Sequence, residues 1–106
     1  MIGQYFRVCA ADEILEGHVK DFELNGTNII LTKVQGRIYA LDNLCTHDGG
    51  DLGGGDIVDG EIECPRHGAR FDLKTGAATR FPAVEGIRTY DVKIENGELL
   101  VAMSED

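Results

Sequence analysis

Five dipeptides that end in glycine divide the chain into short segments, and this spacing constrains the fold more than any other feature of the sequence. They are Asn25-Gly26, Gln35-Gly36, Asp59-Gly60, Thr75-Gly76 and Asn96-Gly97. Asn-Gly and Asp-Gly suit two-residue hairpin turns, because both central residues of such a turn adopt positive φ. Short segments between hairpin turns favour antiparallel strands. The sequence therefore predicts an all-β, antiparallel fold.

The segments between these turns have the composition of strands. We expect strands over residues 19–24, 27–34, 37–41, 88–95 and 98–103. Residues 28–34 are β-branched and apolar on both faces, which predicts a central strand. Tyr90, Val92 and Ile94 alternate with charged residues, which predicts a half-buried strand. Helical signals are confined to residues 11–16, where we expect a turn or two capped by Asp12.

Length and composition are those of one globular domain. The chain has 106 residues, of which 42% are hydrophobic, and we expect residues 1–106 to form a single domain. No apolar stretch approaches the roughly 20 residues that cross a bilayer, so we expect no membrane association. Residues 1–7 lack the pattern of a secretory signal. A cytoplasmic location is therefore expected.

The charge of the chain is strongly negative and unevenly distributed. The formal net charge is −9, which makes nucleic acids and anionic membranes unfavourable partners. Between Arg37 and Arg66 there is no Lys or Arg, whereas seven acidic residues lie there. They are Asp42, Asp48, Asp51, Asp56, Asp59, Glu61 and Glu63. This acidic stretch is either a solvated face that maintains solubility or a docking surface for basic partners.

Two short segments each combine one cysteine with one histidine. Cys45-Thr46-His47 has the spacing C-x-H, and after sixteen intervening residues Cys64-Pro65-Arg66-His67 has the spacing C-x-x-H. Thiolate and imidazole are ligands of zinc and of iron–sulfur centres, so Cys45, His47, Cys64 and His67 are candidate metal ligands. The third cysteine, Cys9, lies in an apolar segment and is expected to be buried.

The segment between the two candidate ligand loops predicts how they meet. Ile57-Val58 and Glu61-Ile62 flank the Asp59-Gly60 turn, which is typical of a small hairpin. A hairpin brings its two ends together, and here those ends lead to the two ligand loops. We therefore expect both loops to contribute to one site.

The ligand types alone leave two metal centres open, zinc and a 2Fe–2S cluster. Zinc fingers usually group cysteine with cysteine and histidine with histidine. Here each loop is a mixed pair, so each loop can give its sulfur to one metal and its imidazole to another. This mixed pairing favours a binuclear centre.

The two loops resemble the ligand motif of Rieske iron–sulfur proteins. The resemblance extends over residues 39–103 and includes Arg70-Phe71-Asp72 and Phe81-Pro82-Ala83. It implies an antiparallel Rieske-type β-sandwich, a small cluster-binding subdomain at about 42–83 formed by the two ligand loops, and one Rieske-type 2Fe–2S cluster. Within it, Cys45 and Cys64 would bind the inner iron, His47 and His67 the outer iron, and Pro82 would lie on a third loop covering the cluster.

Four positions differ from the high-potential branch of that family, the Rieske subunits of cytochrome bc complexes. Those subunits have a disulfide at the positions of Gly50 and Arg66, and a serine and a tyrosine at the positions of Ala69 and Phe71. The serine and tyrosine hydroxyls hydrogen-bond cluster sulfurs and favour the reduced cluster. We therefore expect a potential near the low end of the Rieske range, which spans roughly −150 to +300 mV.

The histidine count selects among Rieske proteins. Ring-hydroxylating oxygenases add a mononuclear iron site with two histidines and a carboxylate. The chain has three histidines, and only His18 is left after the cluster, so we expect it to have no chemical role. The resemblance then implies an electron-transfer ferredoxin, without an enzymatic activity of its own. Its partners would be a flavin-dependent reductase as donor and a terminal oxygenase as acceptor.

Two other functions stay open from the sequence. The chain is also compatible with the small Rieske subunit of an assimilatory nitrite reductase. A zinc-stabilised binding module is the alternative from a different class. Because a carrier moves between partners, we expect a monomer.

Overall fold

The computed structural model describes residues 4–46 and 48–103, and nearly all regular structure within them is β-strand. One short 3-10 turn, η1 (Ala11–Glu13), follows the first strand. The strands are β1 (Gln4–Ala10), β2 (Val19–Leu24), β3 (Thr27–Val34), β4 (Arg37–Asp42), β5 (Asp56–Val58), β6 (Glu61–Glu63), β7 (Arg70–Asp72), β8 (Ala78–Arg80), β9 (Thr89–Tyr90), β10 (Val92–Glu95) and β11 (Glu98–Met103). The predicted all-β, antiparallel class is confirmed.

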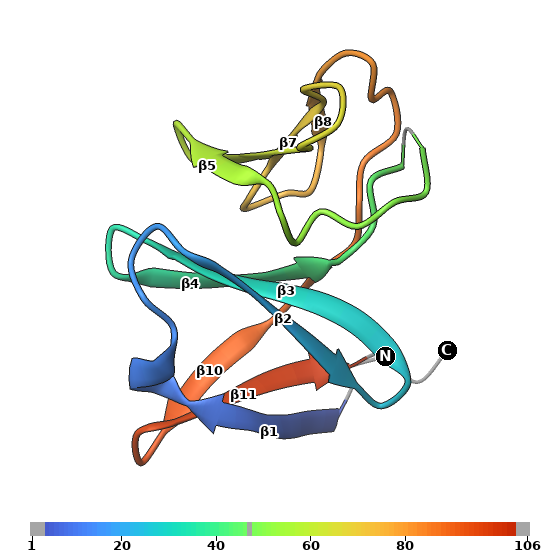
Figure 1. Cartoon of the computed structure of the whole chain (residues 1–106). Helices are drawn as coiled ribbons and strands as arrows, with labels where there is room; N and C mark the ends of the chain where they lie inside the picture. Colours follow the sequence, from blue (N-terminus) through green and yellow to red (C-terminus); the bar gives the residue numbers. More distant parts are fainter. Residues whose placement is uncertain (1–3, 47, 104–106) are drawn as a thin grey trace.

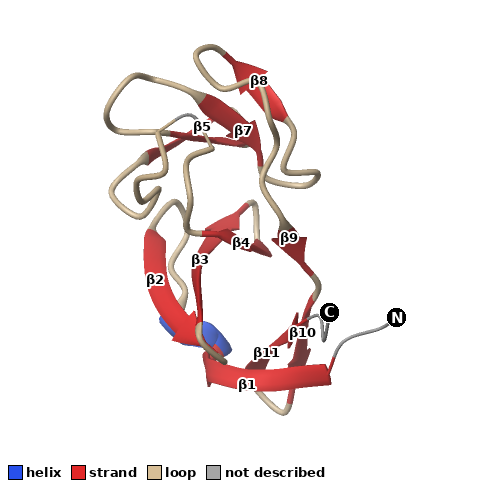
Figure 2. Cartoon of the chain, turned by 90° about the vertical axis from the view of Figure 1, so that its right-hand side faces the viewer, coloured by secondary structure: helices blue, strands red, loops and turns tan. Residues whose placement is uncertain are grey.

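The strands form three antiparallel sheets, with strand orders β1-β11-β10, β2-β3-β4-β9 and β5-β6-β7-β8. The first two sheets make up the lower part of the molecule in Figure 1, which we call the base. The third sheet and the loops around it form a separate upper part, which we call the lobe (Figures 1 and 2). Strands of the lobe have three residues each; a two-residue turn joins β5 to β6, and longer loops join β6 to β7 and β7 to β8.

Strand β3 belongs to both hydrophobic cores of the protein. Ile30 packs into the core shared with the lobe, whereas Ile29 and Leu31 pack into the core of the base. All three side chains are fully buried. Because successive strand residues point to opposite faces, a strand between two cores needs apolar residues on both. The prediction of a central strand from residues 28–34 is thereby confirmed.

The hairpin turns around β3 have the conformation that their sequences predict. Asn25 and Gly26 have φ of 54° and 81°, and Gln35 and Gly36 have φ of 53° and 79°. Two consecutive positive φ values fit a two-residue turn between tightly paired strands. Strands β2 (19–24) and β3 (27–34) have the predicted bounds. Strand β4 extends one residue beyond the predicted strand over 37–41 and ends at Asp42.

The prediction of one continuous strand over residues 88–95 is wrong. The segment forms β9, which pairs with β4, and β10, which pairs with β11, so the chain changes sheets at Asp91. Strand pairing depends on the neighbours available in three dimensions, and the alternation of residues along one segment carries no information about them. Ile94 is 54% exposed, so the predicted burial fails at that position.

The predicted helix over residues 11–16 is reduced to the single turn η1, and Asp12 lies inside that turn instead of capping it. The carboxylate of Glu13 accepts a hydrogen bond from the backbone N–H of Ala10 at 3.0 Å. Cys9 is buried, as expected. Within the two described ranges, no helix has the length and apolar character needed to cross a membrane.

Candidate metal centre

Both candidate ligand loops lie in the lobe and face each other. The first loop connects β4 to β5, and the second connects β6 to β7. Strands β5 and β6 pair through the Asp59-Gly60 turn, with Ile57 opposite Ile62. The predicted hairpin between the two loops is thereby confirmed.

The two loops share one backbone design. In the first loop, the N–H of Cys45 donates to the carbonyl of Gly50 at 2.8 Å, and the N–H of Gly49 donates to the carbonyl of Cys45 at 2.8 Å. In the second loop, the N–H of Cys64 donates to the carbonyl of Ala69 at 2.7 Å, and the N–H of Gly68 donates to that of Cys64 at 3.2 Å. Each cysteine thus begins a tight loop that closes on itself.

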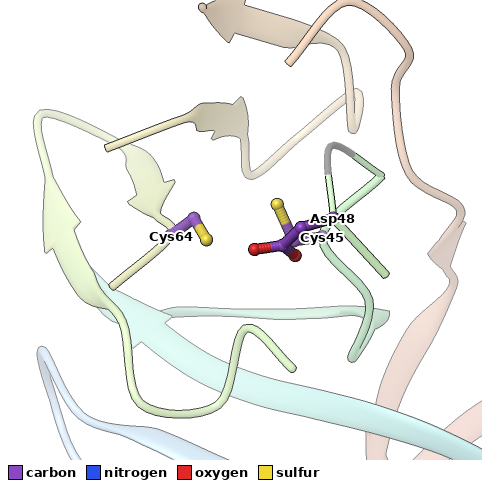
Figure 3. Close-up of side chains that lie close together, drawn as sticks. All are labelled: Cys45, Asp48 and Cys64. Atoms are coloured by element: carbon purple, nitrogen blue, oxygen red, sulfur yellow. The ribbon is translucent and has the colours of Figure 1, made fainter. Parts of the chain in front are cut away.

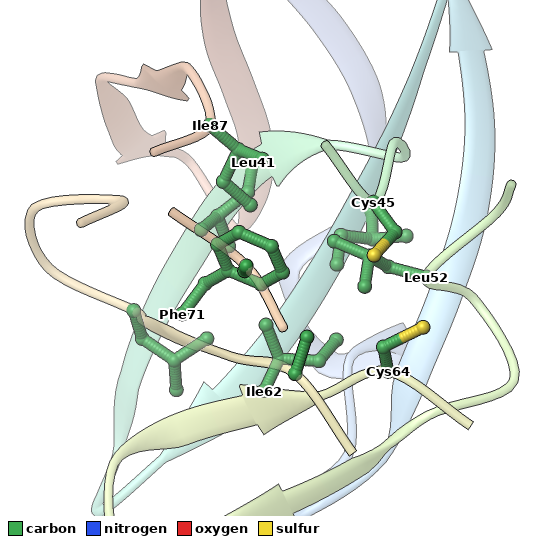
Figure 4. Close-up of a cluster of buried hydrophobic side chains, with 11 residues drawn as sticks. Leu41, Cys45, Leu52, Ile62, Cys64, Phe71 and Ile87 are labelled. Atoms are coloured by element: carbon green, nitrogen blue, oxygen red, sulfur yellow. The ribbon is translucent and has the colours of Figure 1, made fainter. Parts of the chain in front are cut away.

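The two thiols are buried side by side. Cys45 and Cys64 are 0% and 1% exposed and belong to the core that the lobe shares with the base (Figure 4). Their Sγ atoms and a carboxylate oxygen of Asp48 all lie within 4.8 Å of one another, and Figure 3 shows the three groups facing the same space. The prediction that both loops contribute to one site therefore holds for the two cysteines.

The histidines are placed differently. The side chain of His67 is 60% exposed, and its Nδ1 lies 4.0 Å from Oδ2 of Asp48. His47 lies outside the described residues. His18 is exposed on the segment before β2, and it is far from both loops in the sequence. The structure therefore brings the two thiols together with Asp48, and the exposed His67 does not belong to that group of side chains.

Polar contacts fix the first loop to its surroundings. The amide oxygen of the buried Asn43 accepts hydrogen bonds from the N–H groups of Leu52 and Gly53 at 2.7 and 2.9 Å. The hydroxyl of Thr46 donates to the carbonyl of Glu85 at 2.6 Å. This last bond ties the first loop to the loop between β8 and β9, which contains Pro82. Cover of the cluster by Pro82 stays a prediction.

An ion pair joins the two loops, and the sequence reasoning missed it. Nε of Arg66 lies 2.5 Å from Oδ2 of Asp48, and Nη2 lies 3.0 Å from Oδ1. This hydrogen bond to Asp48 is the main cause that raises the pKa of the Arg66 guanidinium. The sequence contains one indication of this pair: Asp48 directly follows one candidate ligand, and Arg66, of opposite charge, directly precedes another.

Several acidic side chains near the centre have basic or phenolic neighbours. Glu61 and Glu63 lie 4.0 and 3.8 Å from the guanidinium of Arg70. The hydroxyl of Tyr90 donates to Asp42, and burial together with this bond raises the pKa of Tyr90 to about 12. Arg66 and Arg70 therefore offset part of the negative charge of the acidic stretch, at Asp48, Glu61 and Glu63.

The donor set fits a cluster with sulfur ligands on one side and imidazole on the other. Buried thiols suit the iron that lies deeper in a protein, and an exposed imidazole suits the iron nearer the surface. The carboxylate of Asp48 is a harder donor and is already engaged by Arg66 and by the N–H of Gly50 at 2.9 Å. We therefore place Asp48 outside the ligand set.

Comparison with known proteins agrees with this chemistry. The family described as Rieske [2Fe-2S] domain matches residues 4–91. A Ralstonia protein, the ferredoxin component of naphthalene 1,2-dioxygenase/salicylate 5-hydroxylase systems, is 43% identical over 103 residues, covering 97% of this chain and 99% of that protein.

Solved structures show the same fold. The ferredoxin of carbazole 1,9a-dioxygenase from Nocardioides aromaticivorans IC177 superposes with a TM-score of 0.90 at 36% identity, covering 95% of this chain and 99% of that chain. A chain in the complex of reduced oxygenase and oxidized ferredoxin in carbazole 1,9a-dioxygenase gives a TM-score of 0.86 at 29% identity, with 92% of both chains covered.

Proposed function

Because the chain belongs to the Rieske [2Fe-2S] domain family and therefore carries one Rieske-type 2Fe–2S cluster, we propose that it is the ferredoxin of a ring-hydroxylating dioxygenase system. In this role it accepts one electron from a flavin-dependent NAD(P)H reductase and delivers it to a terminal oxygenase. The full-length similarity to ferredoxin components of such systems supports this assignment. It has no catalytic reaction of its own.

The observation that carries the proposal is the pair of buried thiols between two loops whose motifs also supply histidines. We assign Cys45 and Cys64 to the inner iron and His47 and His67 to the outer iron. The burial of both cysteines and the exposure of the His67 side chain support this orientation. The cluster-binding part then covers about residues 42–83 within one Rieske domain.

The protein's own residues give the cluster its environment. When bound, the cluster supplies a one-electron redox centre. Cys45 and Cys64 hold it in the lobe, where Leu52, Ile62 and Phe71 exclude water from the sulfur side. His67 brings the other side to the molecular surface, so a partner protein can approach the centre closely there.

The side chains behind the loops support a low potential. Ala69 and Phe71 are fully buried and carry no hydroxyl group. Hydrogen bonds to cluster sulfurs stabilise the more negative, reduced cluster, so their loss lowers the potential. We propose a potential near the low end of the Rieske range.

Exposed apolar and exposed acidic side chains on the lobe support the proposal that partner proteins bind there. Phe81 and Val84 are 77% and 75% exposed on the loop that Thr46 ties to the first ligand loop. Asp51, Asp56 and Asp59 are exposed on the first loop and the β5-β6 hairpin. Exposed apolar side chains suit contact with a partner protein, and acidic groups elsewhere on the lobe suit basic partner surfaces. We propose a cytoplasmic, monomeric carrier that uses this surface for its partners.

The alternatives receive less support. A zinc-stabilised module does not agree with membership in a [2Fe-2S] family. The small subunit of an assimilatory nitrite reductase is less favoured, because the relatives of similar length described above belong to dioxygenase systems.

Spectroscopy of the purified protein tests the cofactor and its ligands. We expect a brown protein whose reduced form gives the electron paramagnetic resonance signal of a mixed-ligand 2Fe–2S cluster. His67→Cys lowers the midpoint potential, because a thiolate adds negative charge to the cluster surroundings. His18→Cys is the matched control and leaves the potential unchanged. A colourless, zinc-loaded protein would contradict the proposal.

Reconstitution tests the place of the protein in the electron path. With a naphthalene dioxygenase reductase and oxygenase, we expect reduction of the oxygenase by NAD(P)H to depend on this ferredoxin. Phe81→Ala weakens binding to the oxygenase with no change in the absorption spectrum, whereas Leu15→Ala, an exposed leucine outside the lobe, serves as control. Oxygenase reduction at the same rate without the ferredoxin would refute the role.

A further inference from the structure

We propose that the Arg66–Asp48 ion pair is a loop clamp, which fastens the two ligand loops to each other and slows loss of the cluster. The inference rests on the proposed function, because it takes Cys45 and Cys64 as cluster ligands. Both members of the clamp lie in the motifs themselves, one residue after His47 and one residue before His67.

The geometry of the clamp is that of a two-point contact. The Nε and Nη2 atoms of Arg66 reach the two carboxylate oxygens of Asp48 at 2.5 and 3.0 Å. A planar guanidinium facing a planar carboxylate fixes orientation as well as distance. The N–H of Gly50 donates to Oδ1 of Asp48 at 2.9 Å and holds the carboxylate in place. The contact therefore sets how one loop lies against the other.

The backbone hydrogen bonds of the two loops have a different role. Those made by Cys45 with Gly49 and Gly50, and by Cys64 with Gly68 and Ala69, stay inside one loop each. They give each loop its shape without joining it to its partner. The clamp crosses between the loops, and the side chains of Arg66 and Asp48 are 36% and 22% exposed.

Gly50 makes room for the clamp. A Cβ atom at this position would lie 2.6 Å from Cζ and from Nη2 of Arg66. Those atoms belong to the end of a flexible side chain, so an alanine at position 50 displaces the guanidinium and leaves the backbone in place. Gly50→Ala is therefore a way to open the clamp without removing either charge.

Cluster loss from the holoprotein tests the clamp. We measure the first-order decay of visible absorbance after adding EDTA, and we expect Arg66→Met, Asp48→Asn and Gly50→Ala each to decay about two- to fivefold faster than the wild type. The double variant R66M/D48N decays no faster than either single variant, because both act through one contact. Added NaCl speeds decay of the wild type more than of the double variant.

A distant ion pair provides the matched control. Arg7 pairs with Glu98 between β1 and β11, in the base. Arg7→Met makes the same chemical change as Arg66→Met, and we expect it to leave the decay rate unchanged. Exchanging the two charges in D48R/R66D returns the rate toward that of the wild type. Additive effects of the single variants, or wild-type rates in all of them, would overturn the clamp.

Amide hydrogen exchange separates this inference from the proposed function. We expect Arg66→Met to speed exchange of residues 49–55 relative to the wild type, because the first loop is no longer fastened. This readout follows opening of the loop and does not use the absorbance of the cluster. A wild-type protein without visible absorption would contradict the proposed function, whereas unchanged exchange in Arg66→Met would contradict the clamp.

Discussion

The base and the lobe of this protein are stabilised in different ways. Strands β1, β2, β3, β4 and β11 of the base have six to eight residues and pair along most of their length. The four strands of the lobe have three residues each. Strands of about three residues are at the short limit of those in globular proteins and add few ladder hydrogen bonds. The base therefore has the features of an independently stable unit, and the lobe does not.

The lobe compensates with contacts that depend on particular side chains. Its two cysteines, the buried amide of Asn43 and the Arg66–Asp48 clamp hold loops that have little regular structure. Metal binding adds free energy that an unfolded site cannot gain, so it stabilises the folded state of the ligand loops. We therefore expect the base to fold without the cluster, and the lobe to become fully ordered only when the cluster is bound.

Among the variants that test the difference between base and lobe, Cys64→Ser is expected to have the largest effect. We expect complete loss of the visible absorbance and much faster amide exchange in β5 to β8, while β3 and β11 keep their protection. Cys9→Ser, at a buried cysteine of the base, keeps the cluster and is the matched control. Equal loss of protection in base and lobe in Cys64→Ser would show that the two regions fold as one unit.

Truncation of the cores sharpens the contrast. Leu99 in the base is fully buried, so Leu99→Ala should lower the free energy of unfolding by about 2–5 kcal/mol, both with and without the cluster. Leu73→Ala, in the core of the lobe, should cost less than Leu99→Ala in the cluster-free protein. Denaturant titration of both forms checks this. Equal costs in the cluster-free protein would contradict a weakly structured lobe.

A smaller effect, a change in midpoint potential, is expected when a hydroxyl group is added to the second ligand loop. Ala69→Ser adds a donor behind the second loop, and we expect it to raise the midpoint potential because a hydrogen bond to the cluster favours the reduced state. Ala78→Ser, on β8, is the control without an expected shift. Protein-film voltammetry measures both potentials. A fall in the potential of Ala69→Ser would count against a bond to a cluster sulfur.

The smallest effect concerns Tyr90, where the base leads into the lobe. Burial and the bond to Asp42 raise its pKa to about 12, above the value near 10 of an exposed tyrosine. The folded protein therefore holds the phenolic proton more tightly than the unfolded chain. This contribution to stability is present below pH 10 and is lost as the pH rises from about 10 to 12. In Tyr90→Phe, the loss of thermal stability over that range should become smaller, and an unchanged pH profile would contradict this role.

Local features of the sequence predicted the parts of the fold that depend on local chemistry. The hairpins at Asn25-Gly26, Gln35-Gly36 and Asp59-Gly60 follow from residues that tolerate positive φ. The approach of Cys45 and Cys64 followed from the hairpin between them. For these tight turns the sequence is a sufficient guide, whereas the helical signals at residues 11–16 yield only the single turn η1.

Features that depend on distant partners were not predicted. Strands β7 and β8 are too short for a periodic pattern, and each forms by pairing with a neighbouring strand, β7 with β6 and β8 with β7. The break at Asp91 depends on which strands are adjacent to the chain on either side. The pairing of Arg66 with Asp48 joins side chains 18 residues apart, and neither residue type indicates the other. These features needed three-dimensional information.

The burial of both faces of β3 has a consequence for strand alignment. In a strand with one polar face, a slip by one residue exposes apolar side chains, so the alternation itself specifies the alignment. In β3 a slip would exchange Ile29 and Leu31 for Ile30 and Thr32, which are also buried, so a slip would not expose apolar side chains at these positions. The turns at its two ends must then fix the alignment, with Leu24 opposite Thr27 and Val34 opposite Arg37. One residue inserted in either turn would therefore misalign the cores of base and lobe together.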